Sequence, residues 1–515
     1  MELDLQPHHF SPSPENLIVN DNKKHTIILG AGPAGLATGH EITANGGQVT
    51  VLERNSFVGG LCRTVHVDGY RFDLGGHRWF TKNEALNDWF KRLLEGELVM
   101  VDRISRIYYN GKYFFYPIQF SDILKQTGPL TILHAGFAFL WAVLRQTVFP
   151  RPIENMQQAY CAQFGKKLYE MFFRQYTEKV WGLPCEELSA DWVSQRSKGL
   201  SVWSVVREAM LGNKDQLTSL IDEFMYPQYG YMRVPERMAE DIQKWGGKVH
   251  LGTTVTRVAY HGPNDVEVFY RKDQEEHSIR GTDVVSTIPL GVLARILEPA
   301  CGAEVENAAR ELAFRDLITV NLKLHRKQVS RDTWLYIQDS DILFGRMHEP
   351  KNWSRDMVPD DEHTSLVLEC FCSKGDAIWN LSDDEIEARC VNDLVDKLQF
   401  IRKEEVEGTN IIRTRETYPI YDMEYAKKIG IINDFLAPLE GIHIVGRGGT
   451  FRYNNSDHSI EMGLLLGQKL LGHEVNHMAV NTETVYHEIK SGSEPERDSY
   501  EIAESDQERA RPDTP

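Results

Sequence analysis

Short apolar runs separated by longer helical stretches predict the secondary structure of this chain. The first run, residues 25–29, enters a glycine-rich turn, and a helical segment leads from that turn to a second apolar run at 48–52. Three more apolar runs lie near residues 250, 284 and 443. We expect these five runs to form one sheet of α/β type, because strand, helix and strand follow one another at its start. The segments between them would form a second lobe.

The second lobe is expected to combine helices with further strands. Residues 103–116 alternate around Asn110-Gly111, which is a strong signal for a two-residue hairpin turn. Residues 118–225 are mostly helical in pattern, and four strand-like runs follow between residues 318 and 418. The sequence shows no internal repeat.

Composition limits the classes of function. The 515 residues are 41% hydrophobic and 26% charged, enough for a large core and more than one lobe. The formal net charge of −18 argues against a nucleic-acid surface, which would need a basic stripe. The seven cysteines lack metal-type spacing, so we expect reduced thiols, no metal site and a cytoplasmic location. Residues 1–24 and 476–515 are polar and are expected to be disordered tails.

One apolar stretch, residues 130–149, is about long enough to cross a bilayer. His134, Arg145 and Gln146 interrupt it, and a proline lies on each flank. This pattern favours a buried or partly surface helix. Association with a membrane surface is the alternative.

The glycine-rich turn after the first strand carries the clearest chemical signal. Gly30 permits the tight turn, Gly32 lets a pyrophosphate approach the backbone, and Gly35 lets helix and strand lie close together. The helix N-terminus offers unpaired N–H groups to phosphates. Glu53 ends the second strand, where an acid accepts hydrogen bonds from a ribose. The unit predicts a dinucleotide cofactor.

The next segment, RNSFVGGLCRT at 54–64, indicates which dinucleotide binds. It resembles the extension found in flavoproteins of the two-dinucleotide-binding type, where a glycine pair lies beside the FAD pyrophosphate. We therefore expect FAD. The cofactor contacts expected in and beyond this segment are Arg54, Gly60, Leu61, Arg63 and Val255.

The predicted fold class is α/β, with a Rossmann-like FAD-binding domain and inserted helical and mixed β substrate lobes. The FAD-binding domain is expected to be discontinuous, made of residues 25–100, 236–295 and 421–475. Residues 101–235 would form a mainly helical cap, and residues 296–420 a β-rich substrate region.

Five motifs carry a resemblance to a known family. They are Asp73–His77, Tyr116–Gln119, Lys179–Pro184 with Arg196, Trp334–Tyr336 with Arg346, and Gly446–His458. Together they resemble UDP-galactopyranose mutases, especially the eukaryotic-type branch. That family belongs to a wider group containing protoporphyrinogen oxidases and amine oxidases. The likeness extends from residue 26 to about residue 472.

The resemblance implies positions around the flavin. Gly76 and His77 would lie on one face of the ring, with His77 among the catalytic residues. Gly446 and Arg447 would lie near the pyrophosphate or ring. Asp457, His458 and Ser459 would begin a helix whose N-terminus faces the cofactor.

The resemblance also implies a nucleotide-sugar site. Arg196 and Arg346 would bind the diphosphate and act in catalysis, since a guanidinium matches phosphate oxygens bidentately. The remaining substrate contacts would be Tyr116, Gln119 and Trp181 at the uridine, Trp353 near the sugar, and Tyr418 and Tyr453 near the diphosphate.

The activity implied is redox-neutral isomerisation of a nucleotide sugar between pyranose and furanose forms. N5 of reduced FAD would attack the anomeric carbon and form a glycosyl adduct, with NAD(P)H a possible reductant. Ile118, Thr177 and Trp353 depart from the mutase pattern, and residues 226–237 lack its glycine-rich motif. These departures leave the sugar and nucleotide open. The alternative is an FAD-dependent oxidase or dehydrogenase of the protoporphyrinogen oxidase, amine oxidase or carotenoid desaturase type.

Overall fold

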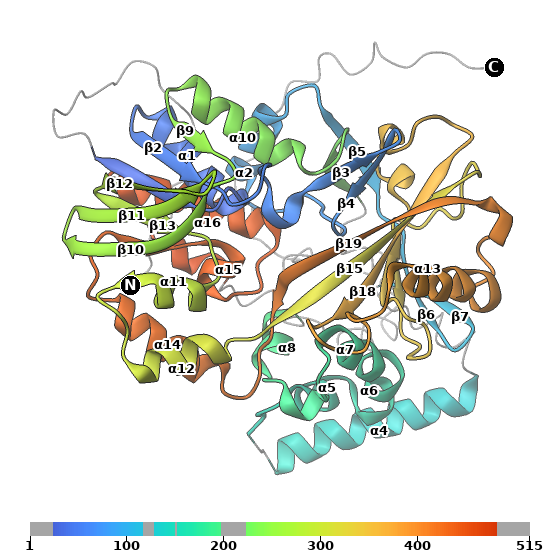
Figure 1. Cartoon of the computed structure of the whole chain (residues 1–515). Helices are drawn as coiled ribbons and strands as arrows, with labels where there is room; N and C mark the ends of the chain where they lie inside the picture. Colours follow the sequence, from blue (N-terminus) through green and yellow to red (C-terminus); the bar gives the residue numbers. More distant parts are fainter. Residues whose placement is uncertain (1–23, 117–127, 150–151, 197–222, 482–515) are drawn as a thin grey trace, which may run out of the picture.

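The computed structural model describes residues 24–116, 128–149, 152–196 and 223–481. A nucleotide-binding type of lobe and a β-rich lobe lie side by side, with a group of helices below the second (Figure 1). Most of both predicted tails lies outside the described residues. All seven cysteines are free thiols, as predicted.

The first lobe is built on a five-stranded sheet in the order β20-β13-β1-β2-β9. All four pairings are parallel, with Ile27 of β1 opposite Val284 on one side and Thr50 on the other. This confirms the predicted sheet. Its strands are β1 (His25–Leu29), β2 (Gln48–Leu52), β9 (Lys248–His250), β13 (Asp283–Ser286) and β20 (Ile442–Ile444).

Both faces of this sheet are covered, which explains why its strands are apolar runs rather than alternating ones. Ile28 packs with α1 (Pro33–Ala44), α10 (Arg233–Lys244) and α16 (Ser456–Leu470). Ile27 and Leu29 face the opposite core. That core is completed by β10 (Thr254–Gly262), β11 (Asp265–Lys272), β12 (Glu275–Gly281), β14 (Leu297–Glu298), α11 (Leu290–Ile296), α12 (Ala303–Glu311) and α14 (Tyr425–Leu436).

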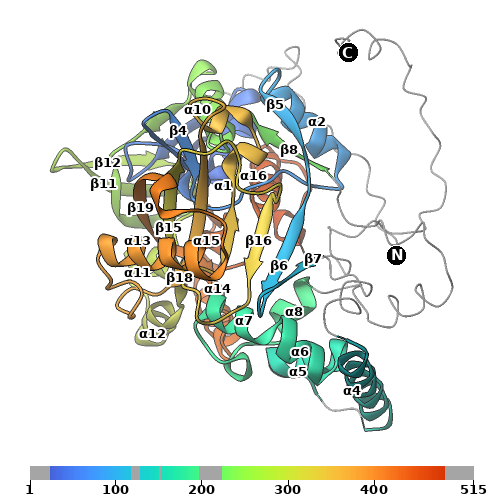
Figure 2. The same ribbon diagram turned by 90° about the vertical axis from the view of Figure 1, so that its right-hand side faces the viewer.

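The second lobe is a seven-stranded sheet in the order β19-β15-β18-β17-β16-β6-β7. Figures 1 and 2 show α13 (Asp383–Asn392) against this sheet. The strands are β19 (Val406–Pro419), β15 (Phe314–Leu324), β18 (Thr364–Cys372), β17 (Arg346–His348), β16 (Trp334–Ile337), β6 (Ser105–Tyr109) and β7 (Lys112–Phe115).

The predicted hairpin is confirmed, with Asn110 and Gly111 both at positive φ (50° and 76°) between β6 and β7. The hairpin was expected in the mainly helical cap of residues 101–235. It belongs instead to the β-rich sheet, because β6 pairs in parallel with β16. That pairing joins residues more than 200 apart in sequence, which local patterning does not reveal.

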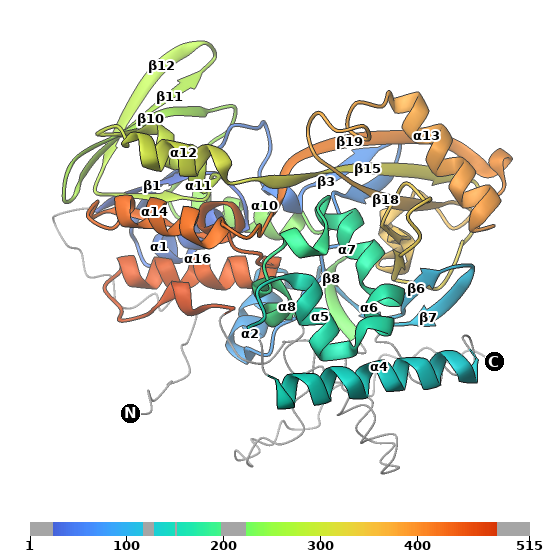
Figure 3. The same cartoon turned by 90° about the horizontal axis from the view of Figure 1, so that it is seen from below.

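In the helical group beneath the seven-stranded sheet, short helices lie along one side of a single long helix (Figure 3). The long helix, α4, carries five exposed apolar side chains on its outer side: Phe137, Leu140, Trp141, Leu144 and Val148. No described helix meets the length and apolarity needed to cross a membrane. The helices are α4 (Pro129–Val148), α5 (Met156–Phe164), α6 (Lys166–Phe172), α7 (Arg174–Trp181) and α8 (Asp191–Arg196).

Short elements connect the two lobes. They are α2 (Glu84–Leu93), α15 (Gly446–Thr450), the paired strands β3 (Thr64–Val67) and β4 (Tyr70–Asp73), and the paired strands β5 (Leu98–Asp102) and β8 (Glu223–Pro227).

Glycines allow α1 and α16 to cross at very short distance. A Cβ atom at Gly463 would lie 2.3 Å from the carbonyl oxygen of Ala34, and one at Gly467 would lie 2.7 Å from Cβ of Glu41. Real Cβ atoms do not approach backbone this closely, so either substitution must push the helices apart. The crossing therefore fixes the start of α1 against the middle of α16.

Replacing Gly463 with alanine tests this contact. We expect Gly463→Ala to lower the free energy of unfolding by about 1–3 kcal/mol, the usual cost of overpacking. Gly430→Ala is the matched control, because Gly430 lies in α14 with no atom within 4 Å of the added Cβ. It should be neutral or stabilise the protein by up to about 1 kcal/mol. Urea denaturation of both variants makes the comparison, and equal effects would contradict the crossing argument.

Candidate cofactor and substrate site

The turn between β1 and α1 has the geometry of a phosphate cradle. Gly30 adopts φ +101°, which side chains rarely accept, and a Cβ at Gly35 would lie 2.4 Å from the carbonyl oxygen of Gly30. A Cβ at Gly32 would have no atom within 4 Å. The backbone of Gly32 therefore borders open space at the N-terminus of α1, where N–H groups and the helix dipole favour an anion.

Glu53 closes the other side of this turn. Its Oε2 accepts a hydrogen bond from the backbone N–H of Ala31 (2.8 Å), and Oε1 accepts from the backbone N–H of Asn55 (2.8 Å). Oε1 also accepts from Nδ2 of Asn55 (2.8 Å), so of its roughly four lone-pair sites the carboxylate keeps about one for a ribose hydroxyl. The carbonyl of Glu53 accepts from Thr253, two residues before Val255 at the start of β10.

The glycine pair of the next segment lies directly against the glycine turn. Gly59 and Gly60 both have positive φ, the N–H of Gly59 donates to Ala31 (2.8 Å), and a Cβ at Gly60 would lie 3.4 Å from Cα of Gly32. Arg63 is held over the Phe57 ring at 3.9 Å, whereas Arg54 is exposed. Leu61 is partly exposed in the intervening 3-10 turn.

The C-terminal motif approaches the same turn from the other side of the sheet edge. A Cβ at Gly446 would lie 2.7 Å from Cβ of Ala34, so this backbone also touches α1. The buried residues Asp457, His458 and Ser459 form the first turn of α16, which runs alongside α1. The start of α1 meets α16 at Gly463, so the first turn of α16 extends about two helical turns beyond that contact.

His77 lies in the loop after Gly75-Gly76, near the middle of the site. Its Nδ1 is 3.1 Å from the carbonyl oxygen of Gly75, and its ring lies 5.4 Å from that of Tyr231. Desolvation, followed by the positive charges of Arg447 and Arg346, lowers the pKa of His77 to about 3. The imidazole is therefore neutral at physiological pH, with Nδ1–H donating to Gly75 and Nε2 left as an acceptor.

The buried carboxylate of Asp73 fixes the loop that carries His77. It accepts hydrogen bonds from Thr64 Oγ1 (2.6 Å), the Tyr226 hydroxyl (2.7 Å) and the backbone N–H of Tyr231 (3.1 Å). Burial nevertheless raises the pKa of Asp73 to about 6. Asp73 therefore ties the loop to β8 and to the segment after it, together with the backbone hydrogen bond from Trp79 to the carbonyl of Met225 (3.1 Å), and so positions His77 relative to Tyr231.

Arg346 is the cation nearest the centre of the β-rich lobe. It lies opposite Glu369 in the ladder between β17 and β18, and its Nη2 donates to both the Glu369 carboxylate and the Tyr418 hydroxyl. Burial opposes its charge, but the Glu369 carboxylate and nearby tyrosines raise the pKa of Arg346 well above its usual value. Arg346 Nε and Glu369 Oε1 are buried without a hydrogen-bond partner among the described residues.

Aromatic rings surround this ion pair. Tyr418 and Tyr453 stack at 5.7 Å, and Trp181 meets both rings edge-on at 6.5 and 6.0 Å. The guanidinium of Arg447 lies 5.4 Å from the Tyr418 ring and 5.0 Å from the Tyr453 ring, and its Nε donates to Asn454 (2.8 Å). Burial raises the pKa of Tyr418 to about 12. Tyr418 therefore stays protonated and can donate a hydrogen bond.

A second aromatic row joins the loop of His77 to the sheet. A Cβ at Gly76 would lie 2.4 Å from the Trp334 ring, so only glycine allows this approach. Trp334 stacks with Tyr336 at 6.2 Å, and Tyr336 meets Tyr116 at 5.3 Å. The structure thus brings His77, the Arg346 strand and Tyr116 into one continuous surface.

A scan against protein-family models matches residues 33–415 to the flavin containing amine oxidoreductases. The chain belongs to this family. Membership makes it a flavoenzyme of the amine oxidase superfamily and implies FAD as its cofactor. The fold class is the predicted one, an α/β flavoprotein.

Sequence relatives within the superfamily differ in activity. A probable UDP-galactopyranose mutase of Klebsiella pneumoniae is 27% identical over 173 residues, covering 33% of this chain and 44% of that protein. L-amino acid oxidase Bs29 of Bothriechis schlegelii is 22% identical over 60% of this chain and 62% of that protein. Phytoene desaturase of Fusarium fujikuroi is 46% identical, but over 57 residues only, 10% of its length. The chain thus spans less than two thirds of these relatives.

Solved structures agree on the fold. A reduced UDP-galactopyranose mutase superimposes with a TM-score of 0.77 at 21% identity, covering 90% of this chain and 98% of that one. A putative protoporphyrinogen oxidase from Exiguobacterium superimposes with a TM-score of 0.65 at 16% identity, covering 87% and 99%. At these identities the likeness establishes the shared fold.

The residues around Gly32 fit the FAD that this family carries. An open cradle at a helix N-terminus suits the pyrophosphate, and a buried carboxylate with a free lone pair suits the ribose. The residues that could hold the group are Gly30, Gly32, Glu53, Gly60, Arg63, Val255, Gly446, Arg447, Asp457 and Ser459.

One predicted substrate residue is enclosed in the core, and two others have side chains outside the described part of the chain. Trp353 is enclosed by Phe224, Tyr226 and Trp334, and its indole N–H donates to the carbonyl of Thr333 (2.8 Å), so it supports the site as core rather than facing it. Gln119 lies outside the described residues, as does the side chain of Arg196 at the end of α8.

Sequence reasoning missed two charged residues that organise the site. Glu369 lies in the middle of the otherwise apolar run TSLVLECFC and is fully buried. An acid at such a position signals a buried partner, here Arg346. Lys179 lies within 3.3 Å of four carbonyl oxygens in residues 337–344, and thereby ties α7 to the loop that leads to Arg346.

The raised pKa of Asp73 predicts that the free energy of unfolding depends on pH. Between its ordinary pKa of 3.8 and the folded value of about 6, the folded protein holds more protons than the unfolded chain. The contribution of Asp73 to the free energy of unfolding therefore falls by up to about 3 kcal/mol as the pH rises from 3.8 to about 6. The free energy of unfolding of the wild type minus that of Asp73→Asn should thus be larger at pH 4.5 than at pH 7.

Urea denaturation at the two pH values measures this difference. Asp88→Asn is the control, because Asp88 is an exposed residue of α2 that pairs with the exposed Lys91 at 3.8 Å. Its difference from the wild type should change little with pH. A difference for Asp73→Asn that stays constant from pH 4.5 to pH 7 would contradict the assignment.

Proposed function

We propose that the protein is a flavin-dependent mutase that isomerises a nucleotide sugar between ring forms. The observation that carries this proposal is the convergence of His77, Arg346, Arg447, Tyr418 and Tyr453 at one place. These residues come from segments as far apart as residues 77 and 453. The guanidinium groups of Arg346 and Arg447 both lie beside the Tyr418 ring, which stacks with Tyr453. Guanidinium and hydroxyl groups are donors of the kind that a nucleoside diphosphate requires.

In this proposal reduced FAD, when bound, supplies the nucleophile for the anomeric carbon of the sugar. The chain's own residues bind and orient the substrate. Arg346, whose Nε has no partner among the described residues, donates to the diphosphate, and the hydroxyls of Tyr418 and Tyr453 donate beside it. Tyr116 offers an aromatic face to the base, whereas Trp181 is buried and supports the rings of Tyr418 and Tyr453 from behind. The neutral His77 accepts a hydrogen bond through Nε2 near the flavin ring.

The electrostatic role of the arginines is to hold the diphosphate near the sugar after the glycosidic bond breaks. A buried guanidinium interacts more strongly with a phosphate than an exposed one, because the surroundings are less polarisable than water. A leaving group held in place also recombines faster than one that diffuses away. Glu369 holds Arg346 in position through their ion pair, and Lys179 holds the loop that leads to it, so the guanidinium is in place before the substrate binds.

A second candidate is an FAD-dependent oxidase or dehydrogenase. The observation that favours it is the Glu369 carboxylate, which pairs with Arg346 and reduces the positive charge offered to a diphosphate. Apolar and aromatic side chains nearby, including Phe371 and Trp334, also suit an uncharged substrate. In that case a substrate hydride would pass to oxidised FAD.

Anaerobic assays separate the two candidates. Dithionite-reduced protein is incubated with UDP-, dTDP- and GDP-sugars, the oxidised protein is treated in parallel, and products are separated by chromatography. Isomerised product from the reduced form alone supports the mutase. No product with any sugar, combined with rapid bleaching of oxidised flavin by an amine or a polyene, supports the oxidoreductase.

Arg346→Lys tests the role of the arginine without leaving Glu369 unpaired. The lysine keeps the charge but loses the bidentate fork, so we expect kcat/KM for the active nucleotide sugar to fall about 100-fold. Flavin content, read from visible absorbance, should not change. Arg310→Lys, on the exposed face of α12, is the control and should retain full activity. Wild-type kcat/KM in Arg346→Lys would rule out the proposed contact.

A further inference from the structure

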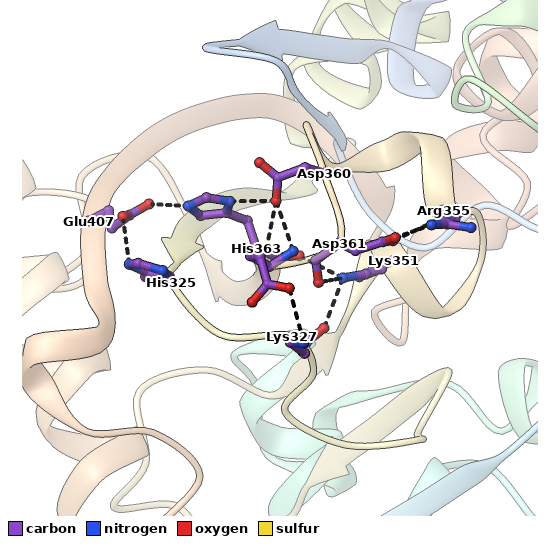
Figure 4. A network of polar contacts seen from close by, with 9 residues as sticks. His325, Lys327, Lys351, Arg355, Asp360, Asp361, His363 and Glu407 are labelled. Carbon is purple, nitrogen blue, oxygen red and sulfur yellow. Dashed lines mark hydrogen bonds and ion pairs between the residues drawn. The ribbon is translucent and has the colours of Figure 1, made fainter.

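Two histidines and a glutamate meet at the end of the β-rich sheet. His325 follows β15, His363 precedes β18, and Glu407 lies at the start of β19. β15 is the middle strand of these three, and its last residue, Leu324, pairs with Thr364 on one side and Val406 on the other. The three residues therefore occupy the same level on neighbouring strands, as Figure 4 shows.

A β-bulge turns Glu407 toward the histidines. Lys323 pairs with Gly408, but the next residue, Leu324, pairs with Val406, which leaves Glu407 as the extra residue of β19. Bulges of this kind re-aim a side chain. One oxygen of Glu407 lies 3.5 Å from Nδ1 of His325, and the other lies 3.5 Å from Nε2 of His363.

The spacing of these atoms suits a small cation. The imidazole rings of His325 and His363 have centroids 4.9 Å apart and planes inclined by 25°. One ligand atom from each of the three residues lies within 4.8 Å of the other two. Around a tetrahedral zinc ion the ligand atoms are about 3.4 Å apart. Each histidine already lies near this distance from one Glu407 oxygen, and His325, whose side chain is 65% exposed, is free to turn inward so that one oxygen faces both.

A second carboxylate orients one of the histidines. Nδ1 of His363 lies 2.7 Å from Oδ1 of Asp360, which also accepts the backbone N–H groups of Glu362 (2.9 Å) and His363 (3.1 Å). A carboxylate held in this way keeps the ring proton on Nδ1 and leaves the Nε2 lone pair facing Glu407. The same carboxylate–histidine arrangement supports zinc ligands in metalloproteins.

We propose that His325, His363 and Glu407 form a binding site for a divalent cation of the zinc type. Imidazole nitrogens favour zinc over magnesium or calcium, which prefer all-oxygen sites. Water would complete a four-coordinate shell. This site revises the expectation from the cysteine spacing that the chain has no metal site.

The position of the site indicates a structural role. Arg315, which pairs with Tyr418 beside the substrate site, is nine residues from Leu324 along β15, a separation of roughly 30 Å. The cation would instead join the ends of three strands and the segment of residues 350–363. Since it binds the folded chain only, it would raise the unfolding temperature by an amount that grows with the logarithm of the ratio of free cation concentration to Kd.

Calorimetric titration of zinc chloride into the full-length, tag-free holoenzyme, stripped with chelator, tests the proposal. We expect one saturable site, no comparable heat from magnesium chloride, and a higher unfolding temperature with zinc. His325→Ala and Glu407→Gln should each weaken zinc binding at least tenfold, because each removes or neutralises a ligand. Asp360→Asn, a positioning variant, should weaken it by about 10–100-fold.

His277→Ala is the matched control. His277 is an exposed histidine of β12 with a single glutamate, Glu275, at 3.9 Å, so its loss should not affect zinc binding. His325 and Glu407 are largely exposed, and both variants should keep the circular dichroism and flavin content of the wild type. Absence of saturable zinc binding, or equal affinity in Glu407→Gln and the wild type, would overturn the proposal and leave an ion-pair network.

Discussion

The hydrogen bonds that β1 makes with β13 and β2 are the constraint on which the remaining architecture depends. β1 and β13 are about 255 residues apart in sequence, yet they pair over four consecutive positions. Parallel strands need long connections, and here the helical group with β6 and β7 lies in the connection from β2 to β9, whereas β15 to β19 lie in the connection from β13 to β20. Because the carboxyl ends of parallel strands share one edge, the glycine turn, Glu53 and Arg447 are brought to that edge together.

Buried charged groups then convert this arrangement into a defined site. Asp73 joins the loop of His77 to the segment after β8, Lys179 joins α7 to the loop before Arg346, and Arg315 donates to the carbonyl of Val180 (2.9 Å). A buried ion without a partner is costly, so each of these groups penalises any displacement of the elements that it connects. They act across the border between lobes, where apolar contact alone would permit sliding.

The predictable features depend on local sequence. The five apolar strands and the Asn110-Gly111 hairpin followed from periodicity and turn chemistry, and the glycine turn followed from its spacing. The pairing of β6 with β16, the enclosure of Trp353 and the bulge at Glu407 depend on distant strands, which no local window contains. Glu369 is partly predictable. Its position in an apolar run signals a buried partner, but the local sequence does not identify that partner as Arg346.

The charge balance around Arg346 bears most directly on function. Arg346 and Arg447 contribute two positive charges, Glu369 removes one, and His77 is neutral, so the centre of the site carries about one positive charge. A diphosphate brings about two negative charges, so further donors must come from tyrosine hydroxyls or from another cation. Arg196 is the residue that the family resemblance offers for this purpose. A mutase needs such further donors at the substrate, whereas an oxidoreductase acting on an uncharged substrate is satisfied by the balance already present.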